Sequence, residues 1–154
     1  WADPFTCQTR RGPVWSRVYE AETGLGRIAA APDRPEVLYS SLDDGRILRH
    51  ERGADGWRHE TIHDGPLGPR GIAAGPFSGD PQRETVAIFG YSGKVEILTR
   101  GEAAWSAETI FVDRDKGHWL AAAELDGRNT TRELLASGYG GRVVLLSRPP
   151  GYGR

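Results

Sequence analysis

The chain has 154 residues, a length that suits one domain with a buried core. Its 20 basic and 21 acidic residues nearly cancel, so a net charge of -1 gives no reason to expect nucleic acid or an anionic membrane as a partner. The single cysteine, Cys7, excludes an internal disulfide and a cysteine-rich zinc site, and no apolar run is long enough for a membrane-spanning helix. The role of Cys7 stays open, as a free thiol or a link to another chain.

The first residues show no periodicity. Residues 1–14 contain Pro4 and Pro13 and are predicted to form an N-terminal arm. Residues 15–20 alternate between apolar and polar side chains, which predicts a strand. Two later segments begin in the same way, at Trp57 and Trp105, and these tryptophans are 48 residues apart.

Three further strand types recur after each segment of this kind. The first is rich in alanine and suits a strand crowded around a narrow axis, although alanine is a poor strand former. It is followed by an apolar strand, a turn with glycine, and a third strand. The turn glycines are Gly45, Gly93 and Gly141, spaced by 48 residues each time.

Four short strands in each period of about 48 residues, without helical periodicity, predict an all-β fold. The pattern favours a β-propeller with three four-stranded blades, and a β-sandwich or trefoil-like barrel is the structural alternative. The blades are expected at about residues 27–62, 71–110 and 119–148, within a three-blade unit that covers 15–154. Residues 15–20 would then add the closing outer strand to the last blade.

Three blades are too few for a closed ring, since propellers have about four to eight. We therefore expect a ring that is incomplete in one chain. A second copy, a larger protein assembly or further blades of a longer polypeptide would complete it, and would cover the strand edges and apolar faces at both ends.

The last repeat carries a family resemblance. Residues 118–127, followed by 133–141, place an acidic loop between an alanine-rich strand and an apolar strand. This arrangement resembles the FG-GAP/VCBS repeat family, and the repeat length and tryptophan-headed strand are more faintly similar to tachylectin-type propeller lectins. Both families are propellers used mainly for binding, so the resemblance implies a binding role.

Blade geometry predicts where a ligand would bind. The loop before the first strand of a blade lies at the same end as the turn between its second and third strands. Aromatic, cationic and acidic side chains are therefore expected to converge there, as a sugar or polar small molecule requires. Packing between blades is the alternative role for the two tyrosines. The predicted ligand-binding residues are Arg70, Tyr91, Asp113, Asp115, His118, Trp119 and Tyr139.

The FG-GAP/VCBS resemblance also implies a calcium site at the opposite end, with Glu124, Asp126 and Glu133 as the metal ligands. Arg128 stands where the family has a third acid, so a loop with a structural role alone is the alternative. His59 and His63 are four residues apart in a predicted strand and are expected to share one face. A third metal ligand is lacking near them in the sequence, so no zinc site is predicted.

These observations predict a non-catalytic binding or scaffolding module that presents its loop face to a carbohydrate or protein partner, in the periplasm or outside the cell. A propeller-type polysaccharide lyase or sugar-converting enzyme is one alternative, with His118 as base, Tyr139 as acid and Arg70 as the charge-neutralising group. An accessory subunit of a larger complex is the other. No acid–base pair can be assigned from the sequence, so binding is favoured over catalysis.

Overall fold

The computed structural model describes residues 16–127 and 131–147, and this part of the chain contains strands and loops but no helix. The prediction of an all-β fold is confirmed. None of the described residues forms a helix that could cross a membrane. The strands are β1 (Leu25–Ala30), β2 (Val37–Leu42), β3 (Arg46–Gly53), β4 (Gly56–Asp64), β5 (Pro69–Ala74), β6 (Thr85–Gly90), β7 (Lys94–Arg100), β8 (Trp105–Val112), β9 (Gly117–Ala123), β10 (Glu133–Gly138) and β11 (Val143–Leu146).

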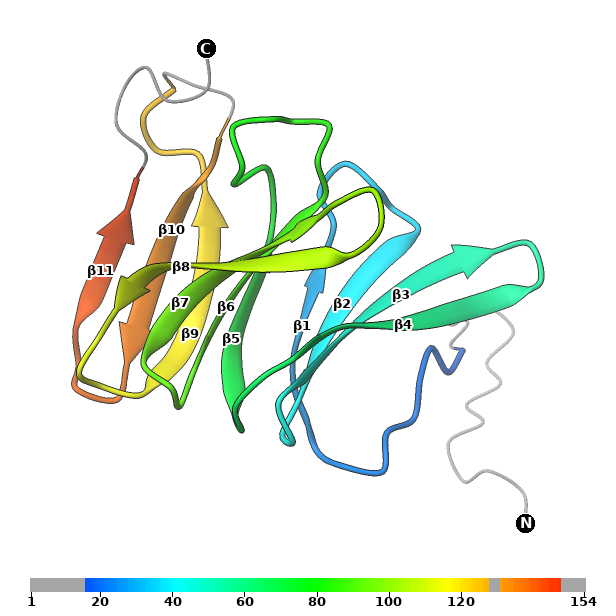
Figure 1. Ribbon diagram of the computed structural model, residues 1–154, viewed down its shortest axis with the longest axis horizontal. Coiled ribbons are helices and arrows are strands. Elements are labelled where there is room, and N and C mark those ends of the chain that lie inside the picture. The colour runs from blue at the N-terminus through cyan, green and yellow to red at the C-terminus, as the bar shows by residue number, and fades with distance from the viewer. Residues whose placement is uncertain (1–15, 128–130, 148–154) are drawn as a thin grey trace, which may run out of the picture.

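The strands form three antiparallel sheets, each made of strands that follow one another in the sequence. The first sheet has the order β1-β2-β3-β4, the middle sheet β5-β6-β7-β8 and the third sheet β9-β10-β11. The middle sheet lies between the other two, and β5 contacts both β1 and β9 (Figure 1). Two sheets thus have the four strands expected of each repeat, while the third has three within the described residues.

The middle sheet is buried on both faces, which explains why β6 is apolar without alternation. Alternate side chains of a strand point to opposite faces, so its residues divide between two cores. One core lies against the first sheet and receives Ile72, Val86, Ile88 and Leu98. The other lies against the third sheet and receives Ala87, Phe89, Val95 and Ile97.

The three repeated turn glycines have the backbone conformation that their position requires. Gly45, Gly93 and Gly141 have φ angles of 111°, 73° and 76°, in the region that favours glycine. Each connects the second and third strands of its sheet. The 48-residue spacing in the sequence therefore marks equivalent turns in the structure.

The predicted strand at residues 15–20 is not seen. Residues 16–20 belong to no strand, and Trp15 lies outside the described residues. Tyr19 instead packs against the first sheet, with its ring 5.2 Å from that of His50 and 5.0 Å from that of His59. On the third sheet, Val143 and Leu145 stay 72% and 52% exposed.

A β-bulge in β4 overturns the prediction that His59 and His63 share a face. The register shifts between Ile47 and Leu48, so that His59 lies opposite His50 but His63 lies opposite Ile47. Ile47 belongs to the core between the first and middle sheets. His59 contacts His50 on the other face, and the bulge thus separates two histidines that regular alternation would have placed together.

Candidate ligand site

At one end of the molecule, the turn after the second strand of each sheet is hydrogen-bonded to the loop before the first strand of that sheet. This arrangement was predicted from blade geometry and is confirmed. It brings the turn tyrosines next to residues at the start of β5 and β9. The three hydrogen bonds run from Asp43 N to Gly24 O at 2.8 Å, from Tyr91 N to Gly68 O at 3.2 Å and from Tyr139 N to Lys116 O at 3.3 Å.

Three aromatic rings and two cations form one group, here called the aromatic cluster: Arg70, Tyr91, Lys116, His118 and Tyr139. The ring of Tyr139 lies 4.7 Å from that of His118 and 6.4 Å from that of Tyr91. The Arg70 guanidinium lies 5.7 Å from the Tyr91 ring, and the Lys116 ammonium 5.3 Å. The two tyrosines are 40% and 58% exposed, so they are open to solvent instead of being buried by packing between sheets.

Trp119 extends this surface toward the first sheet. It neighbours His118 on β9 and so points to the other face, where the Arg27 guanidinium lies 4.7 Å from its ring. Close packing of β5 against β9 requires Gly71, since a Cβ atom there would stand 2.8 Å from Leu120 N. The glycine thus brings the inner strands close enough for Arg27 of the first sheet to reach Trp119 of the third.

The predicted aspartates support the turn that carries Tyr139. Asp115 accepts hydrogen bonds from the backbone N–H groups of Gly140 and Lys116. Asp113 forms an ion pair with Arg142. They therefore act through the geometry of the turn, and the described contacts do not direct either one at a ligand.

Three residues of the site are not among the predicted ligand-binding residues: Arg27, Asp43 and Lys116. The sequence placed Asp43 and Lys116 in loops at this end, but gave neither a role. Asp43 forms an ion pair with Arg70 at 2.9 Å and thereby holds the cation beside Tyr91. A signal did exist for Asp43, because it occupies the same repeat position as Tyr91 and Tyr139, 48 and 96 residues earlier. Arg27 and Lys116 gave no such signal, since their roles depend on how far their side chains reach.

The two tyrosines differ in acidity. The hydrogen bond with Tyr139 and then that with Arg70 lower the pKa of Tyr91, while the same hydrogen bond with Tyr91 raises the pKa of Tyr139. Arg70 and Lys116 both act to lower the pKa of Tyr91, because a nearby cation favours the phenolate.

Four buried polar atoms have no hydrogen-bond partner within the described part of the chain, and all four lie in segments that reach this end. They are Arg27 Nε, Asp43 Oδ1, His63 Nε2 and His118 Nδ1. Asp43 Oδ1 has an ion-pair partner, since a terminal nitrogen of Arg70 lies 2.9 Å away. Buried polar atoms are nearly always satisfied in proteins, so these four are exceptions within the described residues.

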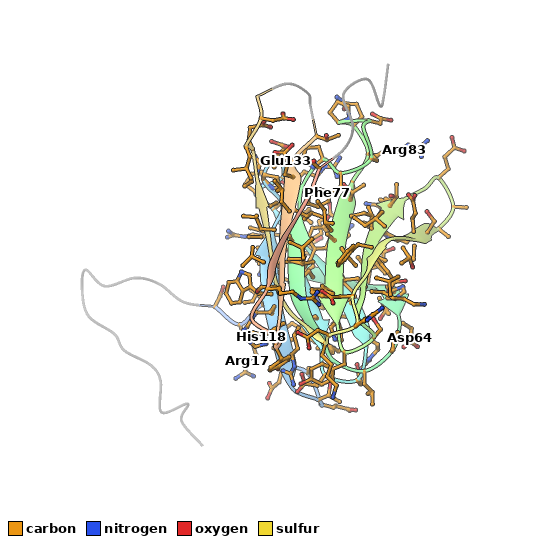
Figure 2. All side chains as sticks on the ribbon, turned by 90° about the vertical axis from the view of Figure 1, so that its left-hand side faces the viewer. Arg17, Asp64, Phe77, Arg83, His118 and Glu133 are labelled. Atoms are coloured by element: carbon orange, nitrogen blue, oxygen red, sulfur yellow. The ribbon has the colours of Figure 1, made fainter. Side chains whose placement is uncertain are left out.

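The predicted metal ligands come together at the end of the third sheet that lies opposite the aromatic cluster. Figure 2 shows Glu133, a predicted metal ligand, at one end and His118, a member of the aromatic cluster, at the other. One carboxylate oxygen from each of Glu124, Asp126 and Glu133 lies within 4.8 Å of the others. Two of these groups already accept hydrogen bonds within the loop, Glu133 from Leu125 N and Glu124 from Gly127 N, both at 2.8 Å. The oxygens suit calcium, and the same contacts also suit a loop that closes by itself, so calcium binding stays a prediction.

A buried ion cluster joins the first and middle sheets. The Glu84 carboxylate contacts Arg49 Nε at 2.5 Å, an Arg34 nitrogen at 2.8 Å and an Arg100 nitrogen at 3.1 Å, and it accepts a hydrogen bond from the Tyr39 hydroxyl. A cavity of about 510 Å³ opens beside it. Its lining includes four arginines and four glutamates, so the formal charge of the cavity is balanced.

No protein-family model matches this chain, and no match to a curated protein was found. The resemblance to the FG-GAP/VCBS family therefore stays a prediction, and the site is interpreted from its own geometry.

Proposed function

We propose that this chain is a non-catalytic binding module whose three sheets are blades of a β-propeller and whose aromatic cluster binds a carbohydrate. Sugars present C–H groups to aromatic rings and hydroxyl groups to polar side chains. A surface that combines both types of group is the one they need.

One observation carries the proposal: the rings of two exposed tyrosines and of His118 lie together beside two cations. Tyr91, Tyr139 and His118 supply ring faces, while Arg70 and Lys116 supply donors at their edges. The rings come from two different sheets, so one ligand would bridge the middle and third sheets. A protein partner that inserts polar side chains is the alternative occupant.

The propeller arrangement rests on the stacking of the sheets in chain order. Each sheet presents an alanine-bearing inner strand to the next, and β5 contacts both β1 and β9. The exposed Val143 and Leu145 continue the pattern on the third sheet, because they occupy the positions of Val95 and Ile97, which are buried in the middle sheet. We propose that a further sheet, from a second copy or a larger assembly, covers this face.

The experiment is a glycan array followed by titration of the best ligands, monitored by NMR or calorimetry. We expect the wild type to bind and the affinity to fall about tenfold or more in Tyr139→Ala. An aromatic contact commonly contributes about 1 kcal/mol, and removal of the Tyr139 ring also exposes His118. Trp57→Ala is the matched control, since it removes an aromatic residue at the far end of β4. Equal loss in both variants, or no binding to any neutral or acidic oligosaccharide, would refute the carbohydrate proposal.

A second candidate function has one observation in its favour. The rings of Tyr91 and Tyr139 lie 6.4 Å apart, and the Arg70 guanidinium lies 5.7 Å from the Tyr91 ring, so two phenols and a cation share one site. A lyase acting on uronate polysaccharides would use such a pair with the arginine to neutralise the sugar carboxylate. The test is the ultraviolet absorbance of an unsaturated product. A rate that Tyr91→Phe abolishes would favour the enzyme over the binding module.

A further inference from the structure

The first sheet carries two histidines where the repeat itself needs none. His50 and His59 lie opposite each other on β3 and β4. The equivalent pair in the middle sheet, 48 residues later, is Leu98 and Ala107, which also lie opposite each other. Leu98 packs in the core between the first and middle sheets, whereas His50 and His59 lie on the face of the first sheet that points away from this core. The first sheet therefore carries an imidazole pair where the middle sheet carries apolar side chains.

A third polar residue accompanies the two histidines. Ser40, on β2, stands where the middle sheet has the core residue Ile88. Its hydroxyl oxygen lies 2.8 Å from Nε2 of His50, and both residues are buried, at 3% and 2% exposed. The polar substitutions are therefore adjacent and in contact, which scattered sequence drift would not produce.

The two imidazoles face each other through the same type of atom. Nδ1 of His50 lies 2.9 Å from Nδ1 of His59, and Tyr19 packs against both rings. A hydrogen bond of this kind holds one proton, so one Nδ1 donates and the other offers its lone pair. If the proton of the donating ring moves to its Nε2, both lone pairs point into the same space.

The surroundings favour lone pairs at neutral pH. Burial, and then the neighbouring His59, lower the pKa of His50 to about 4. Ser40 can accept a hydrogen bond from Nε2–H of His50, which leaves Nδ1 unprotonated. A polar partner on the far nitrogen is the usual arrangement around an imidazole that binds a metal.

We propose that His50 and His59 form a two-histidine site for a divalent transition metal such as Zn²⁺, Ni²⁺ or Cu²⁺, with solvent completing the coordination. Imidazole nitrogen suits these ions, whereas the carboxylates of Glu124 and Asp126 suit calcium. Tetrahedral binding at about 2.0 to 2.1 Å requires the two nitrogens to be about 3.3 Å apart. The rings would separate by about 0.4 Å, which the exposed His59 can provide by a small rotation.

Zinc titration of the full chain tests the site, with calorimetry for stoichiometry and histidine-ring NMR for location. All proteins carry Cys7→Ser, because a thiol binds the same ions. We expect one zinc ion to shift the ring signals of both histidines, and affinity to fall more than tenfold in His59→Ala. His50→Leu is the second variant. This variant introduces leucine, which the middle sheet has at the equivalent position, Leu98. It is therefore expected to fold and to lose zinc binding as His59→Ala does.

Two controls separate this site from other metal binders. His63→Gln changes a histidine of the same strand that points to the opposite face, and it is expected to keep wild-type affinity. Ser40→Ala is expected to weaken zinc by about tenfold, through the loss of its contact with His50. Zinc affinity that is unchanged in His59→Ala, or ring shifts confined to His63 and His118, would overturn the proposal.

Discussion

Replacing Glu84 with alanine is expected to destabilise the protein more than any other single change to a surface or boundary charge. The carboxylate is 8% exposed and contacts three guanidinium groups and one hydroxyl. Arg49 is itself only 6% exposed, so it cannot regain full hydration after the carboxylate is removed. Arg34 and Arg100 are 36% and 44% exposed, and water can replace much of what they lose.

The magnitude follows from the partners that stay buried. The fully buried Tyr39 hydroxyl loses its acceptor, which costs about 1 to 3 kcal/mol. Arg49 keeps Glu51 at 2.8 Å and is therefore only partly uncompensated. The sum lies in the range of about 3 to 5 kcal/mol found when one partner of a buried ion pair is removed. For a domain of this length, that lowers the midpoint of thermal unfolding by about 10 °C.

Urea unfolding followed by tryptophan fluorescence measures the loss. Glu102→Ala is the matched control, since it removes an exposed carboxylate at the same cavity and should stay within about 0.5 kcal/mol of wild type. Tyr39→Phe should cost about 1 kcal/mol, because it removes the hydrogen bond and keeps the ion pairs. A double change of Glu84 and Arg49 to leucine should recover part of the loss, since neither charge is then left alone. A cost below about 1 kcal/mol for Glu84→Ala would refute the reasoning.

The same carboxylate predicts a pH dependence with a definite sign. Burial acts to raise the pKa of Glu84, but hydrogen bonds from Arg49 and Tyr39 hold it below its usual 4.5. A group whose pKa is lower in the folded state stabilises that state above its unfolded pKa and loses this effect as the pH falls. Stability should therefore fall below about pH 4.5, and this part of the fall should be absent in Glu84→Gln.

Three further changes test other parts of the structure. Gly71→Ala should cost about 1 to 3 kcal/mol by urea unfolding, because its Cβ would stand 2.8 Å from Leu120 N and 2.9 Å from the Trp119 carbonyl carbon. Calcium should raise the midpoint of thermal unfolding, with a dissociation constant of about 10⁻⁴ to 10⁻³ M. Asp126→Asn should abolish this rise. A wild type whose midpoint does not respond to calcium would mean that the loop has a structural role alone. Leu145→Glu should lower the molecular mass measured by light scattering if the exposed face of the third sheet binds a second copy, and a mass equal to that of wild type would contradict this.

The sheets could be predicted because their signals are local. Each turn needs a glycine with positive φ, and the apolar segments on either side alternate or run as buried strands do. The repeat then placed Tyr91 and Tyr139 at one end, next to Arg70 and His118. This inference required no knowledge of side-chain contacts, since it depended only on which end of a strand each residue occupies.

Other features could not be predicted because they depend on partners distant in the sequence. Glu84 meets Arg34 and Arg49, which come from the first sheet, and nothing in its own segment signals burial. The bulge in β4 changes which face His63 occupies, yet one additional residue in a strand leaves no pattern. The predicted strand at residues 15–20 failed for a related reason. Alternation gives a face to bury, but the structure packs the partly buried Tyr19 against two imidazoles without pairing its backbone in a strand.

The repeat itself provides a way to separate fold from function. Where the sheets keep the same type of residue, as at Gly45, Gly93 and Gly141, the fold requires it. Where one sheet departs, as at His50 against Leu98, the departure is a candidate for a function, because position 98 shows which residue type the other sheet uses. This reasoning predicts that returning His50 to leucine preserves or raises stability, since it replaces a buried polar group by an apolar one. The same change should remove a binding property, and a variant that loses both would mean that the histidine is part of the core.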